Sequence, residues 1–267
     1  GRSGSTLLSK MFNEVDDIAS FAEPDILTSC IFMREPDGSR DQEITRLIRS
    51  CVHMVCKLQG VRTYTIKWRD WIIHIGDLIH AAFPNDRNIF LYRDAEMWAN
   101  SWYRVYTKAG IDFDGPADLS WLGGQDEASR LIPLFHRFTE GFGKATTIEA
   151  LVTSWLSTTD GYLRLYQQGI PFLAIRYEDL NTHREQVVRS IFDYCDVPTS
   201  QVQAALRAFE RDAQQGTPLE GTSQQAGDIQ FSVSDEQVAR LRAILQKHDS
   251  IKTPDFAVPG TLEIKQA

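Results

Sequence analysis

The first eight residues constrain the chain most, because two glycines and three small hydroxyl residues stand directly before an apolar stretch. Residues 1–8 read Gly-Arg-Ser-Gly-Ser-Thr-Leu-Leu, and the apolar stretch 7–12 is expected to form a helix. A glycine turn that leads into a helix N-terminus directs backbone N–H groups toward one point, where the helix dipole favours an anion. The guanidinium of Arg2 has a planar shape suited to phosphate or sulfate oxygens. The segment predicts an anion site, with a flexible Gly/Ser tail as the alternative. Its candidate residues are Arg2, Ser3, Gly4, Ser5 and Thr6.

This loop resembles a nucleotide P-loop but differs from it at one position. A Walker loop reads G-x-x-x-x-G-K-[ST], and here Gly4-Ser5-Thr6 stands in place of Gly-Lys-Ser/Thr. The lysine is absent, and Arg2 is the nearest cation. Because such a loop follows a strand, we expect a strand upstream of Gly1 that this sequence does not contain, as in an excised or trimmed domain.

Composition narrows the class of protein. The 267 residues contain no long Pro/Gly/Ser linker, so we expect a single domain over residues 1–267. A net charge of −8 disfavours a nucleic-acid partner. No apolar run approaches the ~20 residues of a membrane span, and no signal peptide is visible. The four cysteines lack zinc-ligand spacing, so we expect free thiols and a reducing, cytoplasmic compartment.

Strands and helices are expected to alternate along the chain. Apolar, β-prone runs predict strands at 64–66, 88–92 and 171–175. Helical spacing of apolar residues predicts the helices, at residues 43–58, 71–83, 95–106, 126–168 with a break near 141–146, 184–194, 200–211 and 235–248. The pattern predicts an α/β, P-loop-type three-layer fold with a central parallel sheet and flanking helices. Ligands of such sheets bind at the carboxyl ends of strands, where Lys67, Arg93 and Tyr177 stand.

Four segments, taken together and in order, resemble the sulfotransferases that use 3′-phosphoadenosine-5′-phosphosulfate. Residues 2–7 are similar to that family's 5′-phosphosulfate loop. Residues 83–94, with Ser101 eight positions after the arginine, are similar to its 3′-phosphate segment. Arg-Tyr-Glu-Asp-Leu at residues 176–180 is similar to a segment that contacts the adenine, and Phe-Ala-Glu-Pro at residues 21–24 is similar to a Ser-Glu-Pro turn.

The resemblance implies roles for individual residues. The opening loop would hold the 5′-phosphosulfate, Arg93 and Ser101 the 3′-phosphate, and Tyr177 would lie near the adenine. Residues 224–227 faintly resemble a late loop that closes over the nucleotide.

Two departures from the family pattern indicate the branch. Many cytosolic members carry Lys-Thr-His at the end of the strand after the loop, where the histidine is the base, whereas this chain has Lys67-Trp68-Arg69. It also has Leu7 where the cytosolic loop ends in tryptophan. The chain therefore looks nearer to the bacterial and tyrosylprotein enzymes, and Glu23 of the Glu-Pro turn is the expected general base.

The expected reaction transfers a sulfuryl group from 3′-phosphoadenosine-5′-phosphosulfate to a hydroxyl or amine and leaves 3′-phosphoadenosine-5′-phosphate. Glu23, Lys67 and Arg2 are the expected catalytic residues. No metal is expected, because the donor has one 5′-phosphate rather than a triphosphate. The acceptor is a small molecule or a peptide, selected by the loops 34–41, 109–124 and 214–228. A P-loop kinase and a non-catalytic relic are the alternative functions.

Several candidate residues have a second interpretation. Glu23 could instead cap a helix or pair structurally with Arg2. Glu178 and Asp179 could form a catalytic carboxylate pair, although capping the next helix is the favoured interpretation. His53 and His74 are reserve candidates for the base. The aromatic stripe at helical spacing predicts core packing, part of which could line an acceptor pocket; its members are Trp98, Trp102, Tyr103 and Tyr106.

Overall fold

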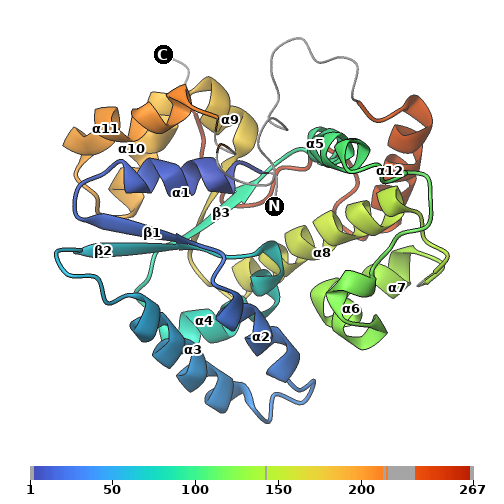
Figure 1. The fold of residues 1–267 in the computed structure, drawn as a ribbon, viewed down its shortest axis with the longest axis horizontal. Coiled ribbons are helices and arrows are strands. Elements are labelled where there is room, and N and C mark those ends of the chain that lie inside the picture. The colour runs from blue at the N-terminus through green and yellow to red at the C-terminus, as the bar shows by residue number, and fades with distance from the viewer. Residues whose placement is uncertain (1–2, 142, 213–214, 216–231, 265–267) are drawn as a thin grey trace.

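The computed structural model describes residues 3–141, 143–212, 215 and 232–264 (Figure 1). Arg2 and the late loop 224–227 therefore lie outside the described residues. The chain is a mixed α/β protein with short parallel strands, as the alternation of its sequence predicted.

Two pairs of parallel strands form the β structure. Strand β1 (Ile18–Ala22) pairs with β2 (Thr63–Lys67), and β3 (Asn88–Tyr92) pairs with β4 (Phe172–Arg176). The parallel pairing confirms the prediction, although the described strands form two separate two-stranded ladders rather than one continuous sheet. The sequence analysis missed β1, because Ile-Ala-Ser-Phe-Ala has only two strong β-formers.

The side chains of β3 and β4 alternate between two faces, and each face packs against helices. Ile89, Leu91, Leu173 and Ile175 contact the cluster formed by α1 (Ser5–Asn13), α10 (Arg184–Tyr194) and α11 (Val202–Leu206). Phe90, Tyr92 and Ala174 contact Tyr162 of α8 (Thr147–Gln167) on the opposite face. These strands are thus covered by helices on both sides, which is the layering expected of the predicted fold class.

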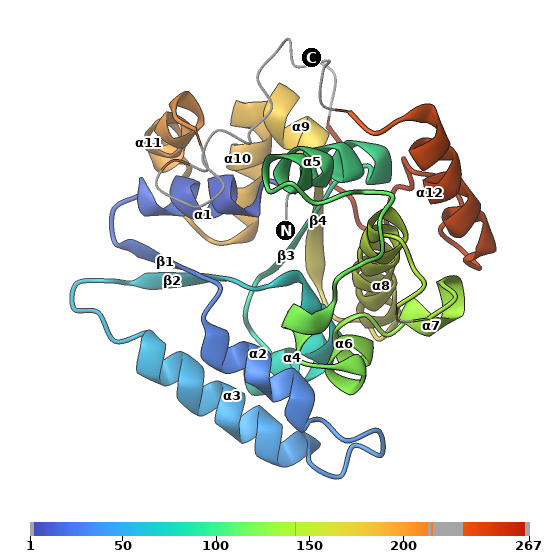
Figure 2. The same ribbon diagram turned by 45° about the vertical axis from the view of Figure 1, so that its right-hand side comes forward.

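The β1–β2 pair also lies between helices. Figures 1 and 2 show α1 on one side of this pair, and α2 (Asp25–Met33) and α3 (Asp41–Val55) on the other. The chain leaves β2 through a 3₁₀ helix, η1 (Asp70–Ile75), and continues as α4 (Gly76–Ala82), where a single helix over 71–83 was expected. Together α2, α3, η1 and α4 bury one apolar cluster.

The remaining helices are α5 (Ala95–Lys108), α6 (Gln125–Leu131), α7 (Phe135–Phe138), α9 (Tyr177–Thr182) and α12 (Asp235–Lys247), with short 3₁₀ helices η2 (Ser120–Leu122), η3 (Thr199–Gln201) and η4 (Arg207–Glu210). Of these, α5, α7 and α12 pack against α8, whereas α9 packs against α10 and β4. The helical region expected over 126–168 is three helices, α6, α7 and α8; the expected break near 141–146 is found before α8, and a second break separates α6 from α7. Helix α8 begins at a capping box in which Thr146 and Glu149 bind each other's backbone N–H groups, so the break is built into the sequence.

The aromatic stripe of α5 is core, as its spacing predicted. Trp98 is buried, and Trp102, Tyr103 and Tyr106 pack against the same cluster, which also contains residues of α8 and α12. All four cysteines are free thiols, as expected. Among the helices of the described ranges, none is long and apolar enough to cross a membrane.

Candidate active site

The opening loop forms a turn that leads directly into α1. Gly4 has a φ of +86°, a left-handed conformation that glycine adopts at no steric cost, and Ser5 is the first helical residue. The helix continues with the bond from Leu8 N–H to the Gly4 carbonyl at 3.0 Å. The first N–H groups of a helix have no partner within it, so this turn has the form of an anion-binding helix terminus.

Lys67 connects this loop to the predicted base. Its ammonium donates to Oγ1 of Thr6 at 3.2 Å and lies 2.5 Å from Oε1 of Glu23. Only 13% of the Lys67 side chain is exposed. The parallel register explains the arrangement, because Ala22 is the partner of Lys67 and Glu23 directly follows Ala22. Three residues far apart in sequence are therefore brought together at the carboxyl ends of β1 and β2.

Glu23 adopts a conformation that is rare for a residue with a side chain. Its φ is +52°, and its N–H donates to the Lys67 carbonyl at 2.7 Å. Left-handed backbone at a non-glycine residue costs about 1 kcal/mol or more and occurs preferentially at functional sites. The sequence indicated only that Pro24 would keep Glu23 out of the right-handed helical region.

The two carboxylate oxygens of Glu23 have different surroundings. Lys67 contacts Oε1, whereas Nε of Arg69 lies 3.8 Å from Oε2, which is beyond hydrogen-bond distance. Arg69 instead binds Asp25 at 2.7 Å. Arg69 therefore forms no hydrogen bond to Oε2, and 34% of the Glu23 side chain is exposed.

A second group of residues lies where β3 and β4 end. The last paired residues are Tyr92 and Arg176, so the next residues, Arg93 and Tyr177, stand beside each other. The Arg93 guanidinium lies over the Tyr177 ring at 4.5 Å, a cation–π contact. Helices α5 and α9, which begin just after these strands, lie at the same end of the pair (Figure 2).

Tyr177 links this group to the opening loop. A Cβ placed on Gly4 would lie 2.4 and 2.6 Å from two carbons of the Tyr177 ring, so the ring occupies the space above the glycine. The Tyr177 ring therefore lies between the anion loop and Arg93. The loop, Lys67, Glu23, Tyr177 and Arg93 form one connected arrangement.

Arg93 is deeply buried for a charged residue. Its relative exposure is 4%, and burial lowers its pKa, which the neighbouring Tyr177 and Glu178 partly oppose. The indole Nε1 of Trp155 donates to the Arg93 carbonyl at 3.1 Å. Ser101 is 2% exposed and lies within two turns of the start of α5. A buried arginine with such fixed surroundings can hold a phosphate or sulfate with little loss of entropy.

Other sequence-based expectations have different outcomes. Ser3 and Ser5 lie in the loop, half-buried, and Arg2 is outside the described residues. Glu178 and Asp179 lie in the first turn of α9, and no side-chain cap is found at α9 or α10, so the capping interpretation is wrong. No sequence signal indicated the contact of Trp155 with Arg93.

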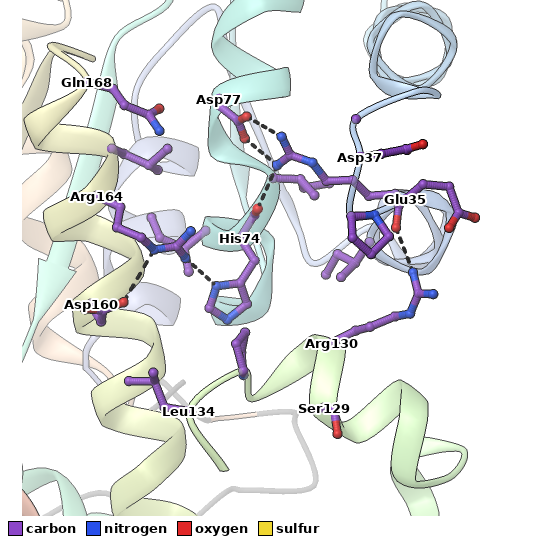
Figure 3. Close-up of a pocket in the computed structure, with 18 of the residues that line it drawn as sticks. Glu35, Asp37, His74, Asp77, Ser129, Arg130, Leu134, Asp160, Arg164 and Gln168 are labelled. Atoms are coloured by element: carbon purple, nitrogen blue, oxygen red, sulfur yellow. Dashed lines mark hydrogen bonds and ion pairs between the residues drawn. The ribbon is translucent and has the colours of Figure 1, made fainter. Parts of the chain in front are cut away.

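A cavity lies away from these residues. It measures about 880 Å³ and lies between the end of α2, the η1–α4 segment, α6 and the C-terminal part of α8 (Figure 3). His74 lies in its wall with Nε2 at 3.1 Å from the Leu131 carbonyl and Nδ1 at 3.4 Å from Arg164. Burial, and then the charge of Arg164, lower the pKa of His74 to about 4. None of the donor-site candidates is among the described residues that line this cavity.

Metal-ligating residues do not cluster in the described part of the chain: no group of three or more His, Cys, Asp or Glu side chains is arranged to hold a metal ion there. The residues described above are mainly cations, hydroxyls and a helix terminus, with the Glu23 carboxylate beside Lys67 and the Glu178 carboxylate beside Arg93.

Comparison with known proteins assigns the family. A family model described as sulfotransferase domain matches residues 73–250, which is more than half of the chain. No curated protein matches the chain. Arg93, Ser101 and Tyr177 lie inside the matched segment, whereas Glu23 and Lys67 precede it. The chain belongs to the sulfotransferase domain family and is a sulfotransferase enzyme.

Proposed function

We propose that the protein transfers a sulfuryl group from 3′-phosphoadenosine-5′-phosphosulfate to an acceptor hydroxyl, or an amine, by in-line displacement. The observation that carries this proposal is the position of Lys67, which contacts both Thr6 of the anion loop and the Glu23 carboxylate. A cation at the loop and a carboxylate beside it are the two groups that sulfuryl transfer needs.

The residues at the anion loop, together with Lys67, would bind and stabilise the leaving phosphate. As the sulfur–oxygen bond of the donor breaks, negative charge gathers on the bridging oxygen. Lys67, the Thr6 hydroxyl and the N–H groups at the start of α1 are positioned for that charge, with Arg2 as a further candidate. Losing one such donor typically costs about 3 kcal/mol of barrier.

Glu23 would act on the acceptor. Its Oε2 takes the acceptor proton while the acceptor oxygen forms the new bond to sulfur, and Oε1 stays against Lys67. The ammonium thus contacts both the base and the loop, so it fixes the carboxylate relative to the reacting phosphate. The uncommon backbone conformation of Glu23 supports a functional rather than a merely structural role.

The nucleotide would extend from the loop toward Arg93. We propose that Arg93 and Ser101 hold the 3′-phosphate and that Tyr177 contacts the adenine, while Ser3, Gly4 and Ser5 complete the 5′ site with Thr6. The burial of Arg93 and its stacking on Tyr177 support a fixed anion site. Because both halves of the chain contribute residues, we also propose that residues 1–267 act as one domain.

A transfer assay tests this function. Wild-type protein is incubated with sulfur-labelled donor, EDTA and a panel of phenols, aliphatic alcohols, amines and a tyrosine peptide. We expect label on at least one acceptor class, and a fall in kcat of about 100-fold or more for Glu23→Gln. Glu43→Gln is the matched control, because Glu43 is an exposed carboxylate that pairs with Arg40 on α3.

Two outcomes would count against the proposal. Full activity of Glu23→Gln would remove Glu23 as the base and leave the transfer reaction standing. Phosphoryl transfer from ATP and Mg²⁺, with no sulfuryl transfer to any acceptor, would favour the kinase alternative and contradict the proposed function itself.

A further inference from the structure

The carboxylate of Glu178 lacks hydrogen-bond donors within the described chain. Glu178 follows Tyr177 in the first turn of α9. Both of its oxygens are shielded from solvent, although a third of the side chain is exposed, and neither is hydrogen-bonded to any residue that the structure describes. The contact with Arg93, between Oε1 and Nε, is 3.7 Å and too long for a hydrogen bond.

Such a carboxylate is costly unless something donates to it. An ionised carboxylate only accepts hydrogen bonds, and a buried acceptor left without donors costs free energy. Glu178 therefore stands as a free acceptor at the edge of the proposed nucleotide site.

Its position beside Arg93 narrows the chemistry of the missing donor. A ligand that satisfies both residues must present an anion to the guanidinium and, next to it, a hydroxyl or amino group to the carboxylate. In a nucleoside 3′-phosphate the 2′-hydroxyl is on the carbon adjacent to the one that bears the phosphate. The adenine amino group lies at the far side of the base. The ribose hydroxyl is thus the donor that lies next to the phosphate, as Glu178 lies next to Arg93 at 3.7 Å.

We propose that Glu178 accepts a hydrogen bond from the ribose 2′-hydroxyl of the bound nucleotide and so selects ribonucleotides over deoxyribonucleotides. Carboxylates recognise ribose hydroxyls in the same way in dinucleotide-binding folds. The inference rests on the proposed function, because it takes Arg93 as the 3′-phosphate anchor. It gives Glu178 a role that neither a carboxylate pair nor a helix cap would provide.

Calorimetric titration with two nucleotides tests the proposal. The ligands are 3′-phosphoadenosine-5′-phosphate and its 2′-deoxy analogue, each titrated into wild type, Glu178→Gln and the control Glu185→Gln. Glu185 is an exposed carboxylate on α10 that pairs with Arg189. We expect wild type and control to bind the ribonucleotide at least 10-fold more tightly, as for a hydrogen bond to a charged group. In Glu178→Gln we expect this preference to fall below about threefold, mainly through weaker ribonucleotide binding.

Three results would overturn the proposal. Equal affinity of wild type for the two nucleotides would do so without any variant, even if Glu178→Gln failed to fold. Tighter binding of the ribonucleotide by Glu178→Gln would show that the carboxylate competes with the phosphate for Arg93. A preference of wild type for 3′-phosphoadenosine-5′-phosphate over 3′-phosphoinosine-5′-phosphate, which lacks the adenine amino group, that is lost in Glu178→Gln while the ribose preference remains, would assign Glu178 to the base instead. If wild type bound neither 3′-phosphoadenosine-5′-phosphate nor its 2′-deoxy analogue, the proposed function would fail together with this inference. Equal binding of both nucleotides would overturn this inference alone.

Discussion

Replacing Gly4 by alanine tests the contact between the anion loop and Tyr177. Two separate costs follow from the structure. The left-handed φ of +86° costs an alanine about 1–2 kcal/mol. The new methyl would also lie 2.4 Å from the Tyr177 ring, and relieving such an overlap typically costs about 1–3 kcal/mol. We therefore expect Gly4→Ala to lower the free energy of unfolding by about 2–5 kcal/mol.

Gly169 separates the two costs. Its φ is +80°, and a Cβ there would meet no atom within 4 Å. Gly169→Ala should therefore show the backbone cost alone, about 1–2 kcal/mol. Urea unfolding followed by circular dichroism measures both variants, and the excess loss in Gly4→Ala reports the overlap with the ring.

A double variant completes the test. Tyr177→Ala removes the ring, so the double variant Gly4→Ala/Tyr177→Ala should be more stable than the sum of the single losses predicts, by about 1–3 kcal/mol. Two results would refute the contact between Gly4 and the Tyr177 ring. One is an equal loss of stability in Gly4→Ala and Gly169→Ala. The other is a double variant whose loss equals the sum of the losses in Gly4→Ala and Tyr177→Ala.

Three further predictions follow from single side chains. Lys67→Met should lower kcat by about 100-fold or more in the transfer assay, because the leaving oxygen loses its cation; a change confined to KM would contradict this role. The depressed pKa of His74, about 4 against 6.5 when unfolded, means that the unfolded chain binds more protons between those pH values. Stability should therefore fall as pH drops through this window, and His74→Gln should reduce the loss between pH 7 and pH 5 by about 1–2 kcal/mol in urea titrations; an unchanged pH profile would oppose it. Asp94 accepts from two N–H groups at the start of α5, so Asp94→Ala should cost about 1 kcal/mol in thermal unfolding and Asp94→Asn much less; equal effects would argue against a cap.

The sequence predicted best the features that depend on local pattern. The strand at 88–92 is found at those residues, and the helices at 95–106 and 235–248 agree within two residues. Each has a strong local signal, since an apolar run with Ile89, Phe90 and Tyr92 marks the strand, and Asp94 and Ser234 cap the helices. The positions of Arg93 and Tyr177 followed from strand ends in a parallel sheet.

What the sequence could not provide is the register between distant segments. Lys67 meets Glu23 only because Ala22 is paired with Lys67, and a shift of one residue would turn the two side chains to opposite faces. Strand β1 itself is short and weakly β-prone. The signals for α2 were present, however, since Pro24 and Asp25 form a typical helix start.

The sequence pattern also could not predict features that depend on backbone contacts between distant residues. The left-handed conformation of Glu23 depends on the bond from its N–H to the Lys67 carbonyl. The need for glycine at position 4 comes from the Tyr177 ring, which is 173 positions away in the chain. Such features depend on the completed fold.

The central claim is that Arg93 holds the 3′-phosphate of the donor nucleotide. The most direct test compares the affinities of 3′-phosphoadenosine-5′-phosphate and adenosine 5′-monophosphate, measured by calorimetry in EDTA, for wild type and Arg93→Lys. We predict that removal of the 3′-phosphate weakens binding to wild type by at least 10-fold and weakens binding to Arg93→Lys far less. Binding of the monophosphate shows that the variant is folded. Equal affinity of wild type for the two nucleotides, or an undiminished preference in the variant, would contradict the account.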